Sequence, residues 1–141
     1  MRVDGACHCG AITFEAEIDP EKVRVCHCTD CQQLSGTAFR VMVPCPESDF
    51  RLKTGSPKIY VKTAESGRRR QQAFCGDCGS PIYATSDEPA RARSLGLRIG
   101  TLAQSVICRR RGSFGSDLFY PGCHHFQVLR RMARHSASSL P

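Results

Sequence analysis

The chain has 141 residues, 20 lysines and arginines against 13 acidic residues, ten cysteines and a formal net charge of +7. That length suits one domain and is too short for a second full one. With 23% charged and 40% hydrophobic residues, the composition is that of an ordinary globular protein, which excludes a disordered tail and a membrane protein. The cysteines are the anomaly, because about 7% approaches the ~8–10% of a disulfide scaffold.

The predicted elements are mostly strands. Apolar and polar residues alternate strictly along residues 12–18 and 39–43, and we expect Pro44 to end the second of these strands. A turn at 64–67 between two further strands predicts a hairpin. A single short helix is expected over residues 29–35, with Thr29 as its N-cap. The full set of predicted strands is 12–18, 39–43, 58–62, 68–74, 81–85 and 95–99. The predicted fold class is therefore mainly β, with little helix.

The cysteines have to be interpreted in the compartment where the protein works. Residues 1–7 contain no apolar stretch of a secretory signal, and no window of the chain approaches 18 apolar residues. We therefore expect a cytoplasmic protein with no membrane span. In a reducing compartment, clustered cysteines bind metal more often than they form disulfides.

Seven of the ten cysteines fall into three tight groups. The groups are Cys7 with Cys9, Cys26 with Cys28 and Cys31, and Cys75 with Cys78. Cysteines one or two residues apart can direct two thiolates to one Zn²⁺ ion at ~2.3 Å, whereas so close a pair rarely suits an unstrained disulfide. Gly76 and Gly79 fit a turn around a metal, because glycine tolerates positive φ. Three such groups together are strong evidence for metal binding.

Seven thiolates cannot all bind one tetrahedral ion, so the count predicts two zinc ions per chain. The first and third groups together would complete a closed four-cysteine site, the form that structural zinc takes. The middle group supplies only three ligands, which leaves a fourth position for water or substrate as in catalytic sites. An alternative stays open, in which Cys45, His27 or another side chain fills that position and both sites are structural.

Four segments of the chain resemble the glutathione-dependent formaldehyde-activating enzyme family. They are GACHCGAITF at 5–14, CHCTDCQQLSGTAF at 26–39, FCGDCGSPI at 74–82 and RIGTL at 98–102. The resemblance covers residues 5–102 and implies a β-tent fold of stacked antiparallel sheets tied by zinc. It also implies a structural ion at the first and third motifs and a catalytic ion at Cys26, Cys28 and Cys31. Counting ligands gives the same partition.

The resemblance implies that the protein adds glutathione to formaldehyde, giving S-hydroxymethylglutathione, or reverses that step as a carbon–sulfur lyase. A thiol of pKa ~8.5 is mostly protonated at neutral pH, and zinc would deprotonate it beside the electrophile. Zinc could instead polarise the aldehyde oxygen. The expected partners are a small thiol such as glutathione and formaldehyde or another small aldehyde. The alternative function is a zinc-stabilised binding or scaffold domain without catalytic activity.

A glutathione site should present cations or backbone donors, because glutathione carries two carboxylates. Lys62 and the run 68–70 are possible cations, although a charge run beside a hairpin turn is usually a solvated face. Three other candidates follow the middle cysteine group, where the family builds part of its pocket, and a fourth lies on the next strand. These candidate substrate-binding residues are Ser35, Gly36, Phe39 and Arg40.

The end of the chain departs from the family pattern. Residues 103–141 lack the usual Asp-Pro-rich turn and terminal tryptophan, and residues 101–141 carry six arginines against one aspartate. We therefore expect a zinc-binding domain over 1–102 and an atypical basic C-terminal segment over 103–141, whose packing on the same domain is left open. The basic balance lies mainly in this segment, and 68–70 is the only basic run in the body, so nucleic acid is not the expected partner.

Overall fold

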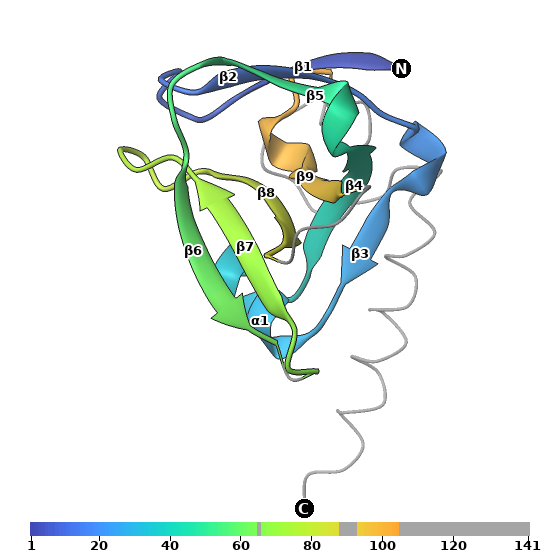
Figure 1. The fold of residues 1–141 in the computed structure, drawn as a ribbon, viewed down its shortest axis with the longest axis vertical. Helices are drawn as coiled ribbons and strands as arrows, with labels where there is room; N and C mark the ends of the chain where they lie inside the picture. Colours follow the sequence, from blue (N-terminus) through green and yellow to red (C-terminus); the bar gives the residue numbers. More distant parts are fainter. Residues whose placement is uncertain (65, 88–92, 105–141) are drawn as a thin grey trace, which may run out of the picture. The chain divides into compact units, whose positions relative to one another are not determined.

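The computed structural model describes residues 1–64, 66–87 and 93–104, and it places them in two antiparallel sheets with one α-helix (Figure 1). These residues belong to one compact unit, Met1–Ser105. The predicted mainly β fold of stacked antiparallel sheets is confirmed. The expected segment 103–141 lies outside the described residues, apart from 103 and 104, and stays a prediction.

The smaller sheet has the strand order β1–β2–β5, with bounds Arg2–Ala6, Thr13–Glu17 and Phe50–Thr54. Gly5 lies opposite Phe14 in the β1–β2 ladder, and a Cβ at Gly5 would lie 2.1 Å from Phe14 Cζ. The fully buried Phe14 ring therefore needs glycine beneath it. Phe14 also packs against Phe50, with ring centroids 5.2 Å apart.

The larger sheet has the order β3–β4–β9–β8–β7–β6. Its strands are β3 Arg24–Cys26, β4 Arg40–Pro46, β6 Lys58–Thr63, β7 Arg69–Phe74, β8 Pro81–Ser86 and β9 Ser94–Arg98. The predicted hairpin is confirmed as β6–β7. The prediction that Pro44 ends a strand is wrong, because β4 continues to Pro46. β3 pairs with β4 only as far as Met42, so Pro44 lies past that ladder, where a strand tolerates a missing N–H.

The two sheets pack together through buried side chains. Phe50 of β5 contacts Tyr83 of β8, with ring centroids 5.4 Å apart and nearly perpendicular rings. Val43 and Leu97 are opposite each other on β4 and β9, and both are fully buried. This packing joins the two sheets around one core.

The α-helix α1 runs from Thr29 to Ser35, as predicted. Its N-cap is Cys28 rather than Thr29, and Gly36 ends it in the left-handed conformation at φ 64°. In Figure 1, α1 lies near the ends of β3 and β7. Three short 3₁₀ helices complete the described elements: η1 Pro20–Lys22, η2 Glu47–Asp49 and η3 Ile99–Thr101. Among the described residues, no helix is long and apolar enough to cross a membrane.

Glu15 joins the three strands of the smaller sheet through two ion pairs. Its carboxylate accepts hydrogen bonds from Arg51 Nε at 2.5 Å and from Arg2 Nη2 at 2.7 Å. Arg51 first, and then Arg2, lower the pKa of Glu15 from its ordinary value of 4.5 to about 2. Because the folded-state pKa is depressed, the ionised carboxylate stabilises the fold above pH 4.5, and that stabilisation is lost as pH falls toward 2.

We expect Glu15→Gln to lower the free energy of unfolding at pH 7 and to have progressively less effect between pH 4.5 and pH 2. Denaturant unfolding of the variant and the wild type at a series of pH values measures this difference. Only pH values at which both chains remain folded and zinc-loaded enter the comparison. Glu17→Gln is the matched control on the same strand, with an exposed side chain. If the effect of Glu15→Gln on the free energy of unfolding does not change with pH, the lowered pKa of Glu15 in the folded state is contradicted.

Candidate metal centres

Two clusters of cysteines could each hold a metal ion. The four-cysteine cluster contains Cys7, Cys9, Cys75 and Cys78, and the three-cysteine cluster contains Cys26, Cys28 and Cys31. Within each cluster, all the Sγ atoms lie within 4.8 Å of one another. The structure thus brings the seven predicted cysteines together in the predicted partition. In the part of the chain that the structure describes, no other group of three such donors meets this criterion.

The four-cysteine cluster joins two turns that are far apart in the sequence. Cys7 and Cys9 lie between β1 and β2, and Cys75 and Cys78 lie between β7 and β8. Sγ of Cys9 is 3.4 Å from that of Cys7 and 3.7 Å from that of Cys75. Cys7 and Cys75 are buried. An ion at this point would tie the smaller sheet to the larger one.

Glycines allow both turns to close around the sulfurs. Gly10 and Gly79 have φ of 79° and 73°, and their N–H groups donate to the carbonyls of Cys7 and Cys75 at 3.0 Å. Gly79 therefore has the predicted positive φ, but Gly76 does not. At Gly76 a Cβ would lie 2.7 Å from Cε of Lys58, an exposed side chain that can move aside.

Hydrogen bonds favour the thiolate form of two cysteines in the four-cysteine cluster, whereas the neighbouring thiols raise the pKa of Cys9. The Ile12 N–H donates to Cys7 Sγ at 3.2 Å and lowers the pKa of Cys7. The Ser80 hydroxyl, followed by the N–H groups of Ser80 and Cys9, lowers the pKa of Cys78 to about 5. Donors placed around the sulfurs are the usual surroundings of metal thiolates.

The three-cysteine cluster is formed where β3 leads into α1. Cys26 ends β3, Cys28 is the N-cap of α1, and Cys31 lies in its first turn. Sγ of Cys28 is 3.6 Å from that of Cys26 and 3.2 Å from that of Cys31. Cys31 is buried and Cys28 is exposed, so the cluster has one side toward solvent.

Both clusters fit a tetrahedral zinc ion. Zn–S bonds of about 2.3 Å at tetrahedral angles place sulfurs about 3.8 Å apart. The four Sγ–Sγ distances given above are all shorter than this value, from 3.7 Å for Cys9 and Cys75 to 3.2 Å for Cys28 and Cys31. Burial first, and then the adjacent Cys26 and Cys28, raise the pKa of Cys31 to about 12. Three thiolates so close together therefore need a cation.

No fourth ligand joins the three-cysteine cluster among residues 1–64, 66–87 and 93–104. Cys45 is fully buried elsewhere, where its Sγ donates to the Glu17 carbonyl at 3.4 Å. The His27 ring packs against Phe39, with ring centroids 5.7 Å apart. Neither side chain closes the cluster in this arrangement. The other two cysteines, Cys108 and Cys123, lie outside the described residues.

The four candidate substrate-binding residues follow the three-cysteine cluster directly. The Ser35 hydroxyl donates to the carbonyl of Cys31 at 2.7 Å, and the Gly36 N–H donates to that of Gln32 at 2.8 Å, so both shape the end of α1. Phe39 and Arg40 are half-buried, and Arg40 is the ladder partner of Cys26. Substrate contact by these four residues stays a prediction.

Arg98 and Gln72 are buried near the three-cysteine cluster, which the sequence pattern does not indicate. Arg98 of β9 is only 6% exposed, and its Nη2 donates to Gln72 Oε1 at 2.9 Å. Arg40 Nη1 reaches the same oxygen at 3.4 Å. Burial first, and then the charge of Arg40, lower the pKa of Arg98 to about 10, while Cys31 and Cys26 act in the opposite direction. The only feature of the sequence that could have indicated this buried group is the presence of an arginine in an otherwise apolar strand.

A cavity of about 380 Å³ lies between α1 and the larger sheet. Its lining residues are Leu34, Tyr60, Gln72, Ala73, Phe74, Gly79, Pro81 and Arg98. Leu34 is one turn of α1 beyond Cys31, and Gly79 belongs to the turn of the four-cysteine cluster. Lys62 of β6 forms an ion pair with Asp30 of α1, which holds the helix over this face of the sheet. The cavity thus lies between the helix that carries Cys31 and the turn that carries Cys75 and Cys78.

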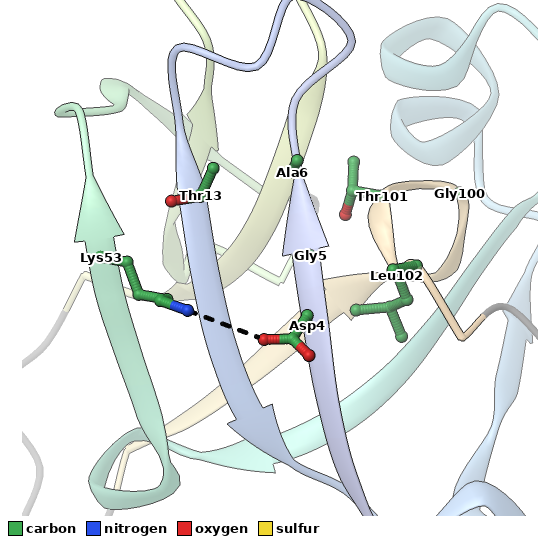
Figure 2. Close-up of a pocket in the computed structure, with 9 residues that line it drawn as sticks. Asp4, Gly5, Ala6, Thr13, Lys53, Gly100, Thr101 and Leu102 are labelled. Carbon is green, nitrogen blue, oxygen red and sulfur yellow. Dashed lines mark ion pairs between the residues drawn. The ribbon is translucent and has the colours of Figure 1, made fainter.

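A second cavity, of about 500 Å³, opens beside the smaller sheet. Figure 2 shows Lys53 of β5 reaching across β2 toward Asp4 of β1, with an Nζ–Oδ1 distance of 3.9 Å. Thr101 and Leu102 form the opposite wall. Among the described residues, no cysteine lines either cavity.

Comparison with known proteins agrees with this architecture. A crystal structure of a Rhodobacter sphaeroides protein from a structural-genomics programme superposes with a TM-score of 0.56 at 21% sequence identity, covering 72% of this chain and 88% of that one. This likeness shows a shared fold. A family model described as glutathione-dependent formaldehyde-activating enzyme matches residues 2–116, well over half of the chain. The chain therefore belongs to the glutathione-dependent formaldehyde-activating enzyme family.

Proposed function

We propose that the chain is a zinc-dependent, carbon–sulfur lyase-like enzyme that adds glutathione or a related thiol to formaldehyde or another small aldehyde, or reverses that addition. The observation that carries the proposal is the three-cysteine cluster, which gathers three thiols around one point with Cys28 exposed to solvent. Membership of the family supports glutathione and formaldehyde as the substrates.

We propose Cys26, Cys28 and Cys31 as the ligands of the catalytic zinc and the four-cysteine cluster as the ligands of a structural zinc. An all-thiolate set suits zinc, and the distances fit its tetrahedral geometry. Zinc at the three-cysteine cluster would supply an exchangeable fourth position that lowers the pKa of a substrate thiol or polarises an aldehyde oxygen.

In the addition, the substrate sulfur forms a bond to the aldehyde carbon while the π bond of the C=O group breaks. The S–H bond also breaks, and its proton ends on the oxygen, which becomes a hydroxyl. No oxidant or reductant is needed. The chain's own part is to bind and orient the thiol beside the exposed side of the cluster. Arg40 and Phe39, which follow α1, are proposed to contact the substrate, and Ser35 and Gly36 are proposed to present backbone and hydroxyl groups at the pocket edge.

We further propose that residues 1–102 form the functional domain and that the protein works in the reducing cytoplasm. Seven closely spaced thiols support a reducing compartment, where such clusters hold metal rather than disulfides. The family match extends to residue 116, so the start of the C-terminal segment also belongs to the family pattern.

The test is exchange NMR of the zinc-loaded full chain with glutathione and formaldehyde. Because only ~3% of a thiol with pKa ~8.5 is ionised at pH 7, full ionisation in the site predicts addition about 30-fold faster than a comparable concentration of free thiol. Cys45→Ser changes a cysteine outside both clusters and should keep the full rate. Zinc-loaded chain that gives only the uncatalysed rate would refute the enzyme and favour a zinc-stabilised binding or scaffold domain.

A further inference from the structure

Arg98 is a buried cation with unused hydrogen-bonding groups. Its Nε and Nη1 have no hydrogen-bond partner among the described residues, and the same holds for Nε of Arg40. Neither arginine forms an ion pair with a carboxylate in this part of the chain, whereas the nearby Lys62 and Arg69 pair with Asp30 and Asp87. A buried charge without a partner costs free energy, so a cationic group held this way indicates a site for an anion.

Gln72 holds the two arginines in place without neutralising them. Its Oε1 accepts from Arg98 Nη2 and from Arg40 Nη1, and Gln72 itself is only 7% exposed. An amide oxygen carries no net charge, so both guanidinium groups keep theirs. The result is a fixed pair of positive charges, of which three buried N–H groups have no partner among the described residues.

Arg98 and Gln72 also line the cavity between α1 and the larger sheet. The other lining residues are mainly apolar, and Cys31 and Cys26 lie close enough to act on the charge of Arg98. A molecule in this cavity could therefore place an anionic end on Arg98 while its other end reaches the three-cysteine cluster.

We propose that Arg98, fixed by Gln72 and next to Arg40, binds a carboxylate of the thiol substrate and so selects thiols that carry one. This inference rests on the proposed function for the identity of the ligand as a thiol. Arginine suits the role because its guanidinium offers several N–H donors in fixed directions, and charge-assisted hydrogen bonds to carboxylates are strong.

The experiment uses the zinc-loaded full chain and two probes that lack a free thiol, S-methylglutathione and its diethyl ester. Dissociation constants are measured by isothermal titration calorimetry. We expect the wild type to bind the free acid roughly 10- to 100-fold more tightly than the ester, as one or two charge-assisted hydrogen bonds would give. Arg98→Met should abolish this preference, and Arg24→Met, which changes an exposed arginine of β3, should keep it.

A second variant covers the case in which Arg98→Met fails to fold. Gln72→Glu gives Arg98 a carboxylate within the chain, which should stabilise the fold while competing with the ligand, so the preference for the free acid should fall toward one. Equal binding of acid and ester by the wild type, absence of binding by the acid, or a preference that survives Gln72→Glu would each overturn the proposal.

The same experiment separates this proposal from the proposed reaction. The probes cannot undergo addition, so their binding does not depend on catalysis. A catalytically inactive chain that prefers the free acid through Arg98 would refute the enzyme and keep the carboxylate site. An active chain without that preference would do the reverse. If Arg98 only balances the charge of the thiolates, Arg98→Met will weaken acid and ester equally, which also overturns the proposal.

Discussion

Replacing Cys75 with serine is expected to unfold the domain. Cys75 is 1% exposed at the end of β7, and its Sγ is 3.7 Å from that of Cys9 on the other sheet. Structural zinc contributes about 10–16 kcal/mol of apparent binding free energy in small zinc domains, as much as the entire ~5–15 kcal/mol stability of a typical domain. Loss of one ligand should remove most of this contribution. Circular dichroism and denaturant unfolding measure the loss.

Cys45→Ser is the matched control for this variant. Cys45 is also fully buried, but its Sγ donates to the Glu17 carbonyl, a bond that a serine hydroxyl can replace. We expect cooperative unfolding and two zinc ions per chain in this control. A Cys75→Ser chain that retains cooperative unfolding and both ions would show that the four-cysteine cluster does not hold the structural metal.

Replacing Cys28 with serine should give the opposite result, a folded chain with one zinc ion and no acceleration of thiol–aldehyde addition. Cys28 is exposed and is the N-cap of α1, yet its side chain makes no capping hydrogen bond. Serine is a preferred N-cap residue, so the helix should be kept. The remaining pair, Cys26 and Cys31, is too few to hold the ion firmly.

Zinc content, the unfolding transition and the exchange-NMR rate are measured on the same sample of Cys28→Ser. The rate should fall to that of the uncatalysed reaction, about 30-fold below the expected wild-type rate. Thr29→Ser, on the next residue of α1, serves as the control and should keep zinc and rate. Full activity in Cys28→Ser would contradict the assignment of the catalytic cluster.

The cavity is lined by residues next to both clusters. Gly79, in the turn of the four-cysteine cluster, and Leu34, on the helix of the three-cysteine cluster, both line it. An ion in the first cluster would fix the position of that turn, which shapes the cavity wall beside the second. Loss of the structural ion should therefore affect substrate binding even before the domain unfolds.

The sequence was most informative where chemistry and spacing coincide. Cysteines one or two residues apart predict shared metal sites because so few bonds separate the thiols. Pairing the first and third groups needed only ligand counting, and the structure brings these Sγ atoms within 4.8 Å of one another. The alternation in residues 12–18 likewise predicted β2, whose buried face carries Phe14 and Ala16.

Three strands were missed because their sequences carry little apolar alternation. In β1 the inward positions are Val3 and Gly5, and the glycine is required by the Phe14 ring rather than by any pattern within β1. β3 has only three residues. β5 is mostly exposed, and only Phe50 at its start packs toward the core. In all three cases the partner strand, not the local sequence, determines the conformation.

Arg98 was missed for a related reason. A sequence pattern assigns charged residues to the surface, and nothing in the pattern around residue 98 shows that this side chain is buried. Its burial follows from the six-stranded sheet order, and its unused donors follow from the position of Gln72, 26 residues away. Such a group is found only when the three-dimensional neighbours are known.

Native mass spectrometry of the zinc-loaded chain tests the division between the two clusters most directly. The wild type should carry two zinc ions, and Cys28→Ser should carry one while its charge-state distribution remains that of a folded protein. A wild-type chain that takes up only one ion, or a Cys28→Ser chain that retains two, would contradict the assignment of a closed four-cysteine site and an open three-cysteine site.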